Sequence, residues 1–471
     1  MAEPQEPLLM KKKIYHENCP GCKVDQLKET KTGIPYKELS FIWIVVLNTS
    51  LPISSLFPFL YFMIRDFHIA KKDEDIGYYA GYVGSAFMLG RVMTSVFWGV
   101  VADRYGRKPV IIFSTFSVVV FNTLFGLSTN FWMAFTTRFL LGCFNGLIGP
   151  IKAYACEVCR EEHQALAMSL VSTARGVGLI FGPALGGFLA QPAEKYPNLF
   201  PEGSLFATFP YFLPCLCISV YAAVVVVACF WLPETLHTHG EVSQEENIEA
   251  ANYSTEPKES LLKNWTLMST IIVYCVFSLH DTAYQEIFSL WALSPKNLGG
   301  LSFTTQNVGE VLAISGFGLL VFQPLIYPIV EKKFGLIKMA RVSAILSVPL
   351  LASYTPIAKL SGISLALALN CASLFKNILS LTIITGFFIL QNDAVPQNQR
   401  GAANGLSVTM MSLFKAFGPA GGGALFSWSQ TRMDASFLPG NEMVFFALNV
   451  VEVLGLLMTF KPFLTFRHQR W

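Results

Sequence analysis

The chain has 471 residues, of which 53% are hydrophobic and only 14% are charged, and its formal net charge is +3. Soluble domains carry about 25% charged residues, so this composition argues against an ordinary soluble globular protein. The small net charge and the scattered basic residues also argue against a nucleic-acid partner. We therefore expect lipid to surround most of the chain.

Apolar runs long enough to cross a bilayer, which takes about 20 helical residues, recur along the chain. They are predicted at 40–64, 78–101, 109–127, 131–154, 165–190, 209–232, 265–292, 309–330, 338–354, 364–391, 402–427 and 441–463. The sequence thus predicts an all-α multi-pass membrane protein with twelve transmembrane helices. Because the number of helices is even, both termini lie on one side.

The basic residues indicate which side this is, because loops rich in Lys and Arg stay in the cytoplasm. With the N-terminus inside, 21 basic residues fall on the cytoplasmic side and 7 fall outside. Both termini are therefore expected in the cytoplasm. Six basic residues remain inside the predicted helices: Arg91, Arg138, Lys152, Arg175, Lys376 and Lys415.

A polar, acidic stretch divides the predicted helices into six plus six. It is expected to be a flexible cytoplasmic linker, because it lacks apolar periodicity. The predicted organisation is a cytoplasmic N-terminal arm at 1–39, a six-helix bundle at 40–232, the linker at 233–264, a second six-helix bundle at 265–463 and a cytoplasmic tail at 464–471.

The two halves contain matching segments. Residues 182–187 in the fifth span match 418–423 in the eleventh at an offset of 236, with Gly-Pro at the start and Gly-Gly at the end of both. Two six-helix pseudo-repeats around a central path are a transporter architecture, in which the solute binds between the halves near the bilayer midplane.

The cytoplasmic arm carries Cys19 and Cys22, and His237 and His239 follow the sixth span on the same predicted side. A Cys-x-x-Cys pair alone is a weak metal signal, because a closed zinc site has four ligands. The two histidines would complete a Cys₂His₂ set. A regulatory zinc ion is therefore a hypothesis, beside a redox role or simple solvent exposure. We expect no other cofactor, with the proton as the coupling ion.

A charged loop follows the second span, with Gly99, Asp103, Arg104, Gly106, Arg107 and Lys108. Asp103 can accept hydrogen bonds from a neighbouring helix N-terminus, and Arg107 can pair with an acid. Glu157, at the end of the fourth span, is the candidate partner. Such a cluster would gate the cytoplasmic face by breaking as the halves rock. The alternative is a determinant of topology only.

The fifth span contains Gly178, Gly182, Pro183, Gly186 and Gly187. Small residues allow helices to approach closely, and a proline permits a bend. The expected role is mechanical, with ordinary close packing as the alternative.

Charges inside a bilayer cost at least ~2.5 kcal/mol and usually mark a transport path or an ion pair. In the fourth span Arg138, Asn145 and Lys152 are spaced to share one face of a continuous helix. The excess of basic residues favours an anionic or carboxylate-bearing solute, with snorkelling or structural pairing as alternatives. The predicted substrate cavity comprises Arg91, Arg138, Asn145, Lys152, Arg175, His280, Tyr284, Gln285, Lys376 and Lys415.

The seventh span is the most polar of the twelve and contains Asp281 and Glu286. A carboxyl group in such a place can exchange a proton in competition with a charged solute. The two acids lie about 140° apart on a helix, so both cannot face one cavity unless the helix unwinds. Asp281 or Glu286 is therefore predicted to couple protons, with a structural ion pair as the alternative.

These motifs together resemble a known family. The loop at 99–108 resembles the loop signature of the major facilitator superfamily, and 178–187 resembles its antiporter motif. Segments 19–22, 156–164 and 233–239 resemble a plant subgroup, the zinc-induced facilitator-like transporters. The resemblance implies exchange of small organic metal chelators, organic anions or monovalent cations for protons, at the vacuolar or plasma membrane.

We therefore expect a proton-coupled antiporter that moves such a solute out of the cytosol by alternating access. Its expected partners are the lipid bilayer, the solute and protons, and it is expected to work as a monomer. Two alternatives stay open: a non-transporting solute or metal sensor with a transporter fold, and a proton symporter. The sequence contains no phosphate-cradling loop, nucleophile elbow or zinc-protease helix, so an enzyme is not expected.

Overall fold

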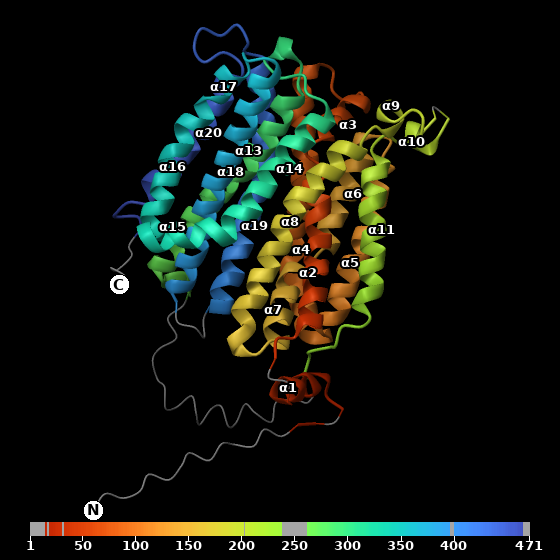
Figure 1. Cartoon of the computed structure of the whole chain (residues 1–471), viewed down its shortest axis with the longest axis vertical. Coiled ribbons are helices and arrows are strands. Elements are labelled where there is room, and N and C mark those ends of the chain that lie inside the picture. The colour runs from red at the N-terminus through yellow and green to blue at the C-terminus, as the bar shows by residue number, and fades with distance from the viewer. Residues whose placement is uncertain are drawn as a thin grey trace, which may run out of the picture.

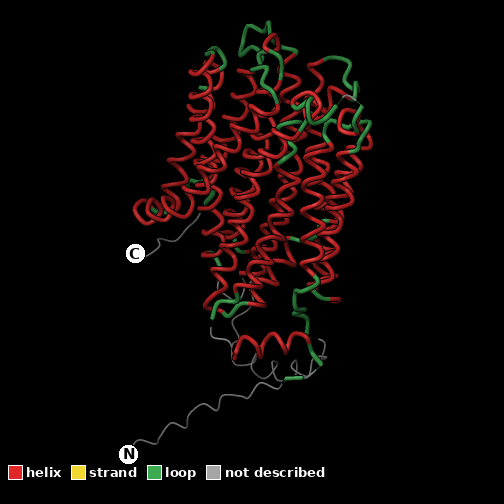
Figure 2. Tube along the Cα trace, turned by 45° about the vertical axis from the view of Figure 1, so that its right-hand side comes forward, coloured by secondary structure: helices red, strands yellow, loops and turns green. Residues whose placement is uncertain are grey.

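The computed structural model describes residues 15–16, 18–30, 33–201, 203–237, 261–395 and 400–464. Helices form all the regular structure in these ranges, as Figures 1 and 2 show. Ten helical segments are long and apolar enough to cross a membrane, and they match ten of the predicted spans. The other two spans are α2 with α3, and α19.

The N-terminal half forms the first bundle, which lies on the right in Figure 1. Its helices are α2 (Tyr36–Ser54), α3 (Leu60–Asp66), α4 (Ile76–Tyr105), α5 (Arg107–Gly126), α6 (Phe131–Phe144), α7 (Ile148–Val158), α8 (Glu161–Leu189), α9 (Pro192–Lys195), α10 (Leu205–Thr208) and α11 (Phe212–Cys229). Before them, α1 (Pro20–Thr30) lies across one end of the bundle, which we call the α1 end. The opposite end is called the far end.

The C-terminal half forms the second bundle. Its helices are α13 (Trp265–Leu293), α14 (Thr305–Val321), α15 (Tyr327–Phe334), α16 (Leu336–Ala352), α17 (Tyr354–Ile357), α18 (Gly362–Asp393), α19 (Arg400–Gln430) and α20 (Asn441–Met458). A π-helical segment at Phe322–Ile326 joins α14 to α15 within the predicted eighth span. Pro324 lies in this segment and has no amide hydrogen to donate, which explains the irregular turn.

Polar side chains fix where several of these helices begin. Asn130 Oδ1 accepts the Met133 amide at the start of α6, and Asn264 Oδ1 accepts the Leu267 amide at the start of α13. Each bond satisfies one of the donors that a helix N-terminus leaves without an intrahelical partner. The starts of the fourth and seventh spans are therefore set locally by the sequence.

The fourth span differs from the prediction of one continuous helix, because it is broken between α6 and α7. The Cys143 carbonyl accepts hydrogen bonds from Thr94 Oγ1 and Trp98 Nε1, both at 2.7 Å. Gly146 lies directly against the Trp98 side chain, where only a glycine fits. Contacts with α4 thus replace helical hydrogen bonds at this point, and Arg138, Asn145 and Lys152 do not lie on one continuous helix as the prediction requires.

The hydrophobic cores show how the bundles meet. At the far end a single core contains side chains of both bundles, including Phe59 and Phe131 of the first and Trp291 and Phe445 of the second. At the α1 end each bundle has its own core, one around Tyr154 and the other around Phe387. The bundles are therefore packed together at the far end and have separate cores toward α1.

Glycines bring the helices together at the far end. A methyl group on Gly187 of α8 would lie 2.7 Å from Gly309 Cα of α14, and Gly423 of α19 lies against Gly77 and Gly81 of α4. Such close approach of backbones is how helices pack tightly in a membrane. Two helix pairs, α4 with α19 and α8 with α14, thus form the seam between the bundles.

Candidate functional site

Four basic side chains converge between the bundles. Lys415 of α19 interacts electrostatically with Asp281, Arg175 and Arg91, and Lys152 interacts with Arg175 and Arg91. Arg175 is exposed, and the other three cations and Asp281 are half-buried. We call these five residues the central charge cluster. Four cations against one carboxylate produce a positive potential that attracts an anion.

Two acids of α13 have different surroundings. The helix is continuous, so Asp281 and Glu286 face apart, as expected from their spacing. Asp281 belongs to the central charge cluster and accepts a hydrogen bond from Gln285 Nε2 at 3.2 Å. Glu286 is only 1% exposed and faces the first bundle, where a methyl group on Gly84 would lie 3.1 Å from its Oε2.

Arg138 is the basic residue that interacts with Glu286. It interacts electrostatically with Glu286 across the seam, and its Nη1 donates to the Pro52 carbonyl at 2.9 Å. Its guanidinium also lies 5.5 Å from the Phe87 ring and 5.3 Å from the Phe125 ring. Within the described residues no hydrogen bond reaches Glu286 Oε2. This carboxyl group is therefore enclosed but not locked in a hydrogen-bonded ion pair.

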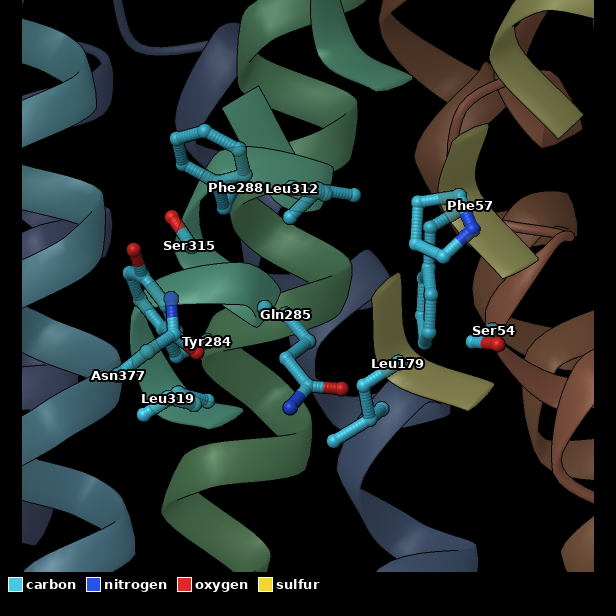
Figure 3. A pocket seen from close by; sticks show the side chains of 12 residues that line it. Ser54, Phe57, Leu179, Tyr284, Gln285, Phe288, Leu312, Ser315, Leu319 and Asn377 are labelled. Atoms are coloured by element: carbon cyan, nitrogen blue, oxygen red, sulfur yellow. The ribbon is translucent and has the colours of Figure 1, made fainter. Parts of the chain in front are cut away.

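A small cavity of about 40 Å³ lies between the bundles, on a face of α13 that does not include Glu286. Tyr284 and Gln285 of α13 line it together with Ser54, Pro183 and Asn377, and Figure 3 shows Gln285 between the two bundles. This volume holds water rather than an organic solute.

His280 and Lys376 do not line a cavity between the bundles, contrary to the prediction. His280 Nδ1 lies 2.9 Å from Glu452 Oε2, and both side chains are almost fully buried inside the second bundle. Lys376 is fully buried, donates to Ser380 at 2.6 Å and interacts electrostatically with Glu452. Glu452 therefore contacts His280 and interacts with Lys376 inside one bundle, and the three side chains form an internal polar network. Asn145 is likewise 1% exposed at the break between α6 and α7.

The predicted contact of Arg107 with Glu157 is present. Arg107 Nη2 and Nε lie 3.2 and 3.3 Å from Glu157 Oε1, and Arg107 also pairs with Asp103. Among the described residues, no helix N-terminal amide donates to Asp103, which corrects the expectation. Glu234 is the acceptor instead, because its carboxylate accepts the Arg107 and Lys108 amides at 3.0 and 3.1 Å.

Glu234 and Thr235 are functional candidates that sequence reasoning missed. Thr235 Oγ1 donates to Glu157 Oε2 at 2.6 Å, so residues 234–235 join the first charged loop to the end of α7. We call Asp103, Arg107, Glu157, Glu234 and Thr235 the α1-end charge cluster. All five belong to the first bundle or the segment that follows it. The sequence signal was Glu234 itself, near the start of segment 233–239, because a carboxylate can accept hydrogen bonds from the N-terminus of a helix.

The glycines of the fifth span pack against two different helices. Gly178 and Gly182 face Ser50 and Ser54 of α2 inside the first bundle, and Gly186 faces Ser55, which directly follows α2. Gly187 faces α14 across the seam, and the Pro183 carbonyl lies near Gly309. The motif therefore packs α8 against its own bundle and against the other one, as a mechanical role requires.

Three of the four predicted metal ligands come together near α1. The ligand atoms of Cys19, Cys22 and His237 lie within 4.8 Å of one another. His239 lies outside the described residues. The arm and the start of the linker, far apart in sequence, are thus neighbours.

Two helical bundles with a cluster of charges between them are the arrangement expected of a membrane transporter. Residues 42–419 match the Major Facilitator Superfamily. The chain is 59% identical to zinc induced facilitator 1 of Arabidopsis thaliana, with 99% of both chains covered. It is 60% identical to zinc induced facilitator-like 1 of the same plant, over 98% of this chain and 99% of that protein, and 60% identical to a probable peptide/nitrate transporter, over 96% and 97%.

Solved structures share the fold. A D-xylose-proton symporter superposes with a TM-score of 0.68 at 14% identity, covering 90% of this chain and 97% of the other. A human organic anion transporter gives a TM-score of 0.62 at 16% identity, covering 91% and 100%. The chain therefore belongs to the major facilitator superfamily, in its zinc-induced facilitator-like subgroup, and is a transporter rather than an enzyme.

Proposed function

We propose that this transporter is a proton-coupled antiporter that exports a small organic anion or metal chelator from the cytosol. The central charge cluster carries the proposal, because four cations with a single carboxylate suit a solute that brings negative groups. A monovalent cation, the other solute class that the family resemblance implies, would meet net repulsion there. The proposed setting is the vacuolar or plasma membrane, with the α1 end and both termini in the cytoplasm.

The packing of the bundles supports alternating access. The shared core closes the far end, while the separate cores leave the central charge cluster on the α1 side of the closure. In this conformation a cytosolic solute would enter from the α1 end. Rocking the bundles about the central charge cluster would open the far end and release the solute there.

Glu286 is the proposed proton site. Its carboxyl group is buried at the seam, faces Arg138 across it and is not fixed by a hydrogen bond at Oε2. Separating the bundles would expose the group to water and change its proton affinity. Asp281 is proposed to contact the solute as part of the central charge cluster. The two acids of α13 would then have different roles, Glu286 in proton binding and Asp281 in solute binding.

A substrate screen in reconstituted vesicles tests the proposal. Carboxylate-bearing solutes and chelators are offered with a pH gradient imposed in either direction, and solute uptake is measured. We expect saturable uptake driven by an acidic compartment on the side that corresponds to the far end. Binding without flux would instead identify a sensor, and movement of solute and protons in the same direction would identify a symporter.

Arg175→Gln refines the test, with Lys359→Gln, an exposed residue beyond the membrane, as the matched control. Loss of a hydrogen bond to a charged group costs about 1.5–3 kcal/mol, or roughly 10- to 100-fold in affinity. We expect Arg175→Gln to raise the KM for an anionic solute by about tenfold or more. An unchanged KM in Arg175→Gln would remove the central charge cluster from the solute site.

A further inference from the structure

Cys19, Cys22 and His237 are held together by backbone contacts that do not involve a metal. The Gly21 amide donates to the Leu236 carbonyl at 3.1 Å. A methyl group on Gly21 would lie 2.8 Å from the His237 ring, so a glycine is needed for α1 to approach this segment. The turn between the two cysteines is therefore fitted against residues 236–237.

The three side chains have the spacing of a tetrahedral site. Cys19 Sγ and Cys22 Sγ lie 3.7 and 3.8 Å from His237 Nδ1. Zinc–sulfur bonds of about 2.3 Å and zinc–nitrogen bonds of about 2.0 Å at a tetrahedral angle place S and N about 3.5 Å apart. The ligand atoms already stand close to the positions that a bound ion needs.

The second ring nitrogen of His237, Nε2, also has a partner. His237 Nε2 lies 3.5 Å from Asp25 Oδ2, and the other oxygen of Asp25 pairs with Lys28 at 2.8 Å. A carboxylate that receives the second ring nitrogen of a ligating histidine fixes its tautomer and orientation. The ring therefore presents Nδ1 to the two thiols.

We propose that Cys19, Cys22 and His237 bind a zinc ion that clips the N-terminal arm to the start of the linker. Two thiolates and an imidazole select zinc over magnesium or calcium, which prefer oxygen ligands. The cysteines are 2% and 4% exposed, while His237 is exposed and leaves a path for the ion.

The proposed zinc site is only a few residues away in sequence from the α1-end charge cluster. His237 is two positions from Thr235, which binds Glu157, and three positions from Glu234, which caps α5. Fixing His237 therefore restricts the segment that holds Arg107 and Glu157. This role concerns an ion on the cytoplasmic arm and does not depend on which solute the central charge cluster carries.

Cobalt substitution tests the site in the full-length purified protein. Co²⁺ bound by two thiolates gives sulfur-to-metal charge-transfer absorption, and Zn²⁺ added afterwards should remove it. We expect one ion per chain in the wild type and loss of the absorption in Cys19→Ser, Cys22→Ser and His237→Ala. Cys371→Ser, which removes an exposed thiol elsewhere, serves as the control and should leave it unchanged.

Asp25→Asn tests whether Asp25 orients His237 for metal binding, because this variant keeps all three ligands. Loss of a second-shell partner should weaken binding about 10- to 100-fold. Equal cobalt binding in the wild type and Cys19→Ser would overturn the proposal. Wild-type affinity in Asp25→Asn would overturn the proposed role of the aspartate.

Hydrogen exchange tests the clip itself. Zinc should slow exchange of backbone amides in 233–237 in the wild type and not in Cys19→Ser. Metal binding with no change of exchange in this segment would contradict a clip.

Discussion

Three neighbouring ionisable residues of α13 have three different environments. His280 pairs with Glu452 inside the second bundle, Asp281 faces the central charge cluster, and Glu286 meets the first bundle at Gly84. The sequence indicated that this stretch is functional and that the two acids face apart. It could not show that His280 points inward, because its partner Glu452 is 172 positions away in the chain.

The His280–Glu452 pair is expected to stabilise the second bundle. Breaking a buried ion pair by removing one partner costs about 3–5 kcal/mol, because the other charge remains buried. Glu452→Gln should therefore lower the melting temperature in detergent markedly. Glu310→Gln, at an exposed position of α14, is the matched control. Equal melting temperatures for the two variants would contradict a structural role for the pair.

At the scale of helices, glycines determine where the bundles touch. The glycine pattern predicted close packing of the fifth span, but not that Gly187 alone of its glycines faces α14 while Gly178 and Gly182 face α2. The break in the fourth span could not be predicted either, because its cause is the contact of Cys143 and Gly146 with Trp98 of another helix.

Gly187→Val is expected to prevent closure of the far end. Its side chain would meet Gly309 and the Thr305 carbonyl, both backbone positions that cannot move aside. Transport should fall at least about tenfold while the protein still folds, since overpacking costs about 1–3 kcal/mol. Gly176→Val lies on the same helix with open space around it and should retain activity. Vesicle uptake of both variants tests this, and normal uptake by Gly187→Val would contradict the role of the seam.

Lys195 makes the far end sensitive to pH. Its Nζ donates to the Gly187 carbonyl at 2.5 Å and to Thr305 Oγ1 at 2.6 Å. Burial lowers the pKa of Lys195 to about 8, although Glu194 acts in the opposite direction. In water the pKa of a lysine is about 10.4, so closure is penalised below about pH 8 and the penalty fades as the pH rises toward 10. Acidification therefore favours opening.

Distance measurements between spin labels at Asn198 and Asn297, in exposed loops of the two bundles at the far end, check this effect. We expect longer distances at about pH 7 than at about pH 9.5, because the charged lysine favours water. Lys195→Met should remove the difference between the two pH values. A difference that persists in Lys195→Met would assign the pH effect to another group.

At the scale of the whole molecule, the sequence predicted the membrane class and the twelve spans, because apolar length is a local property. The family motifs indicated the two-bundle fold, and the family match confirms it. The closed far end was not predictable, because the shared core joins side chains from both halves of the chain. The sequence predicts that 233–237 belongs to a flexible linker, yet this segment binds both α1 and the first charged loop.

The protein is proposed to exchange protons for solute through Glu286. The most direct measurement compares two kinds of transport in vesicles containing wild-type protein or Glu286→Gln: solute accumulation driven by a pH gradient, and solute-for-solute exchange without one. We predict that Glu286→Gln loses the first and keeps the second, because the glutamine cannot carry a proton across the seam. Accumulation driven by the pH gradient in Glu286→Gln at the wild-type rate would contradict the account.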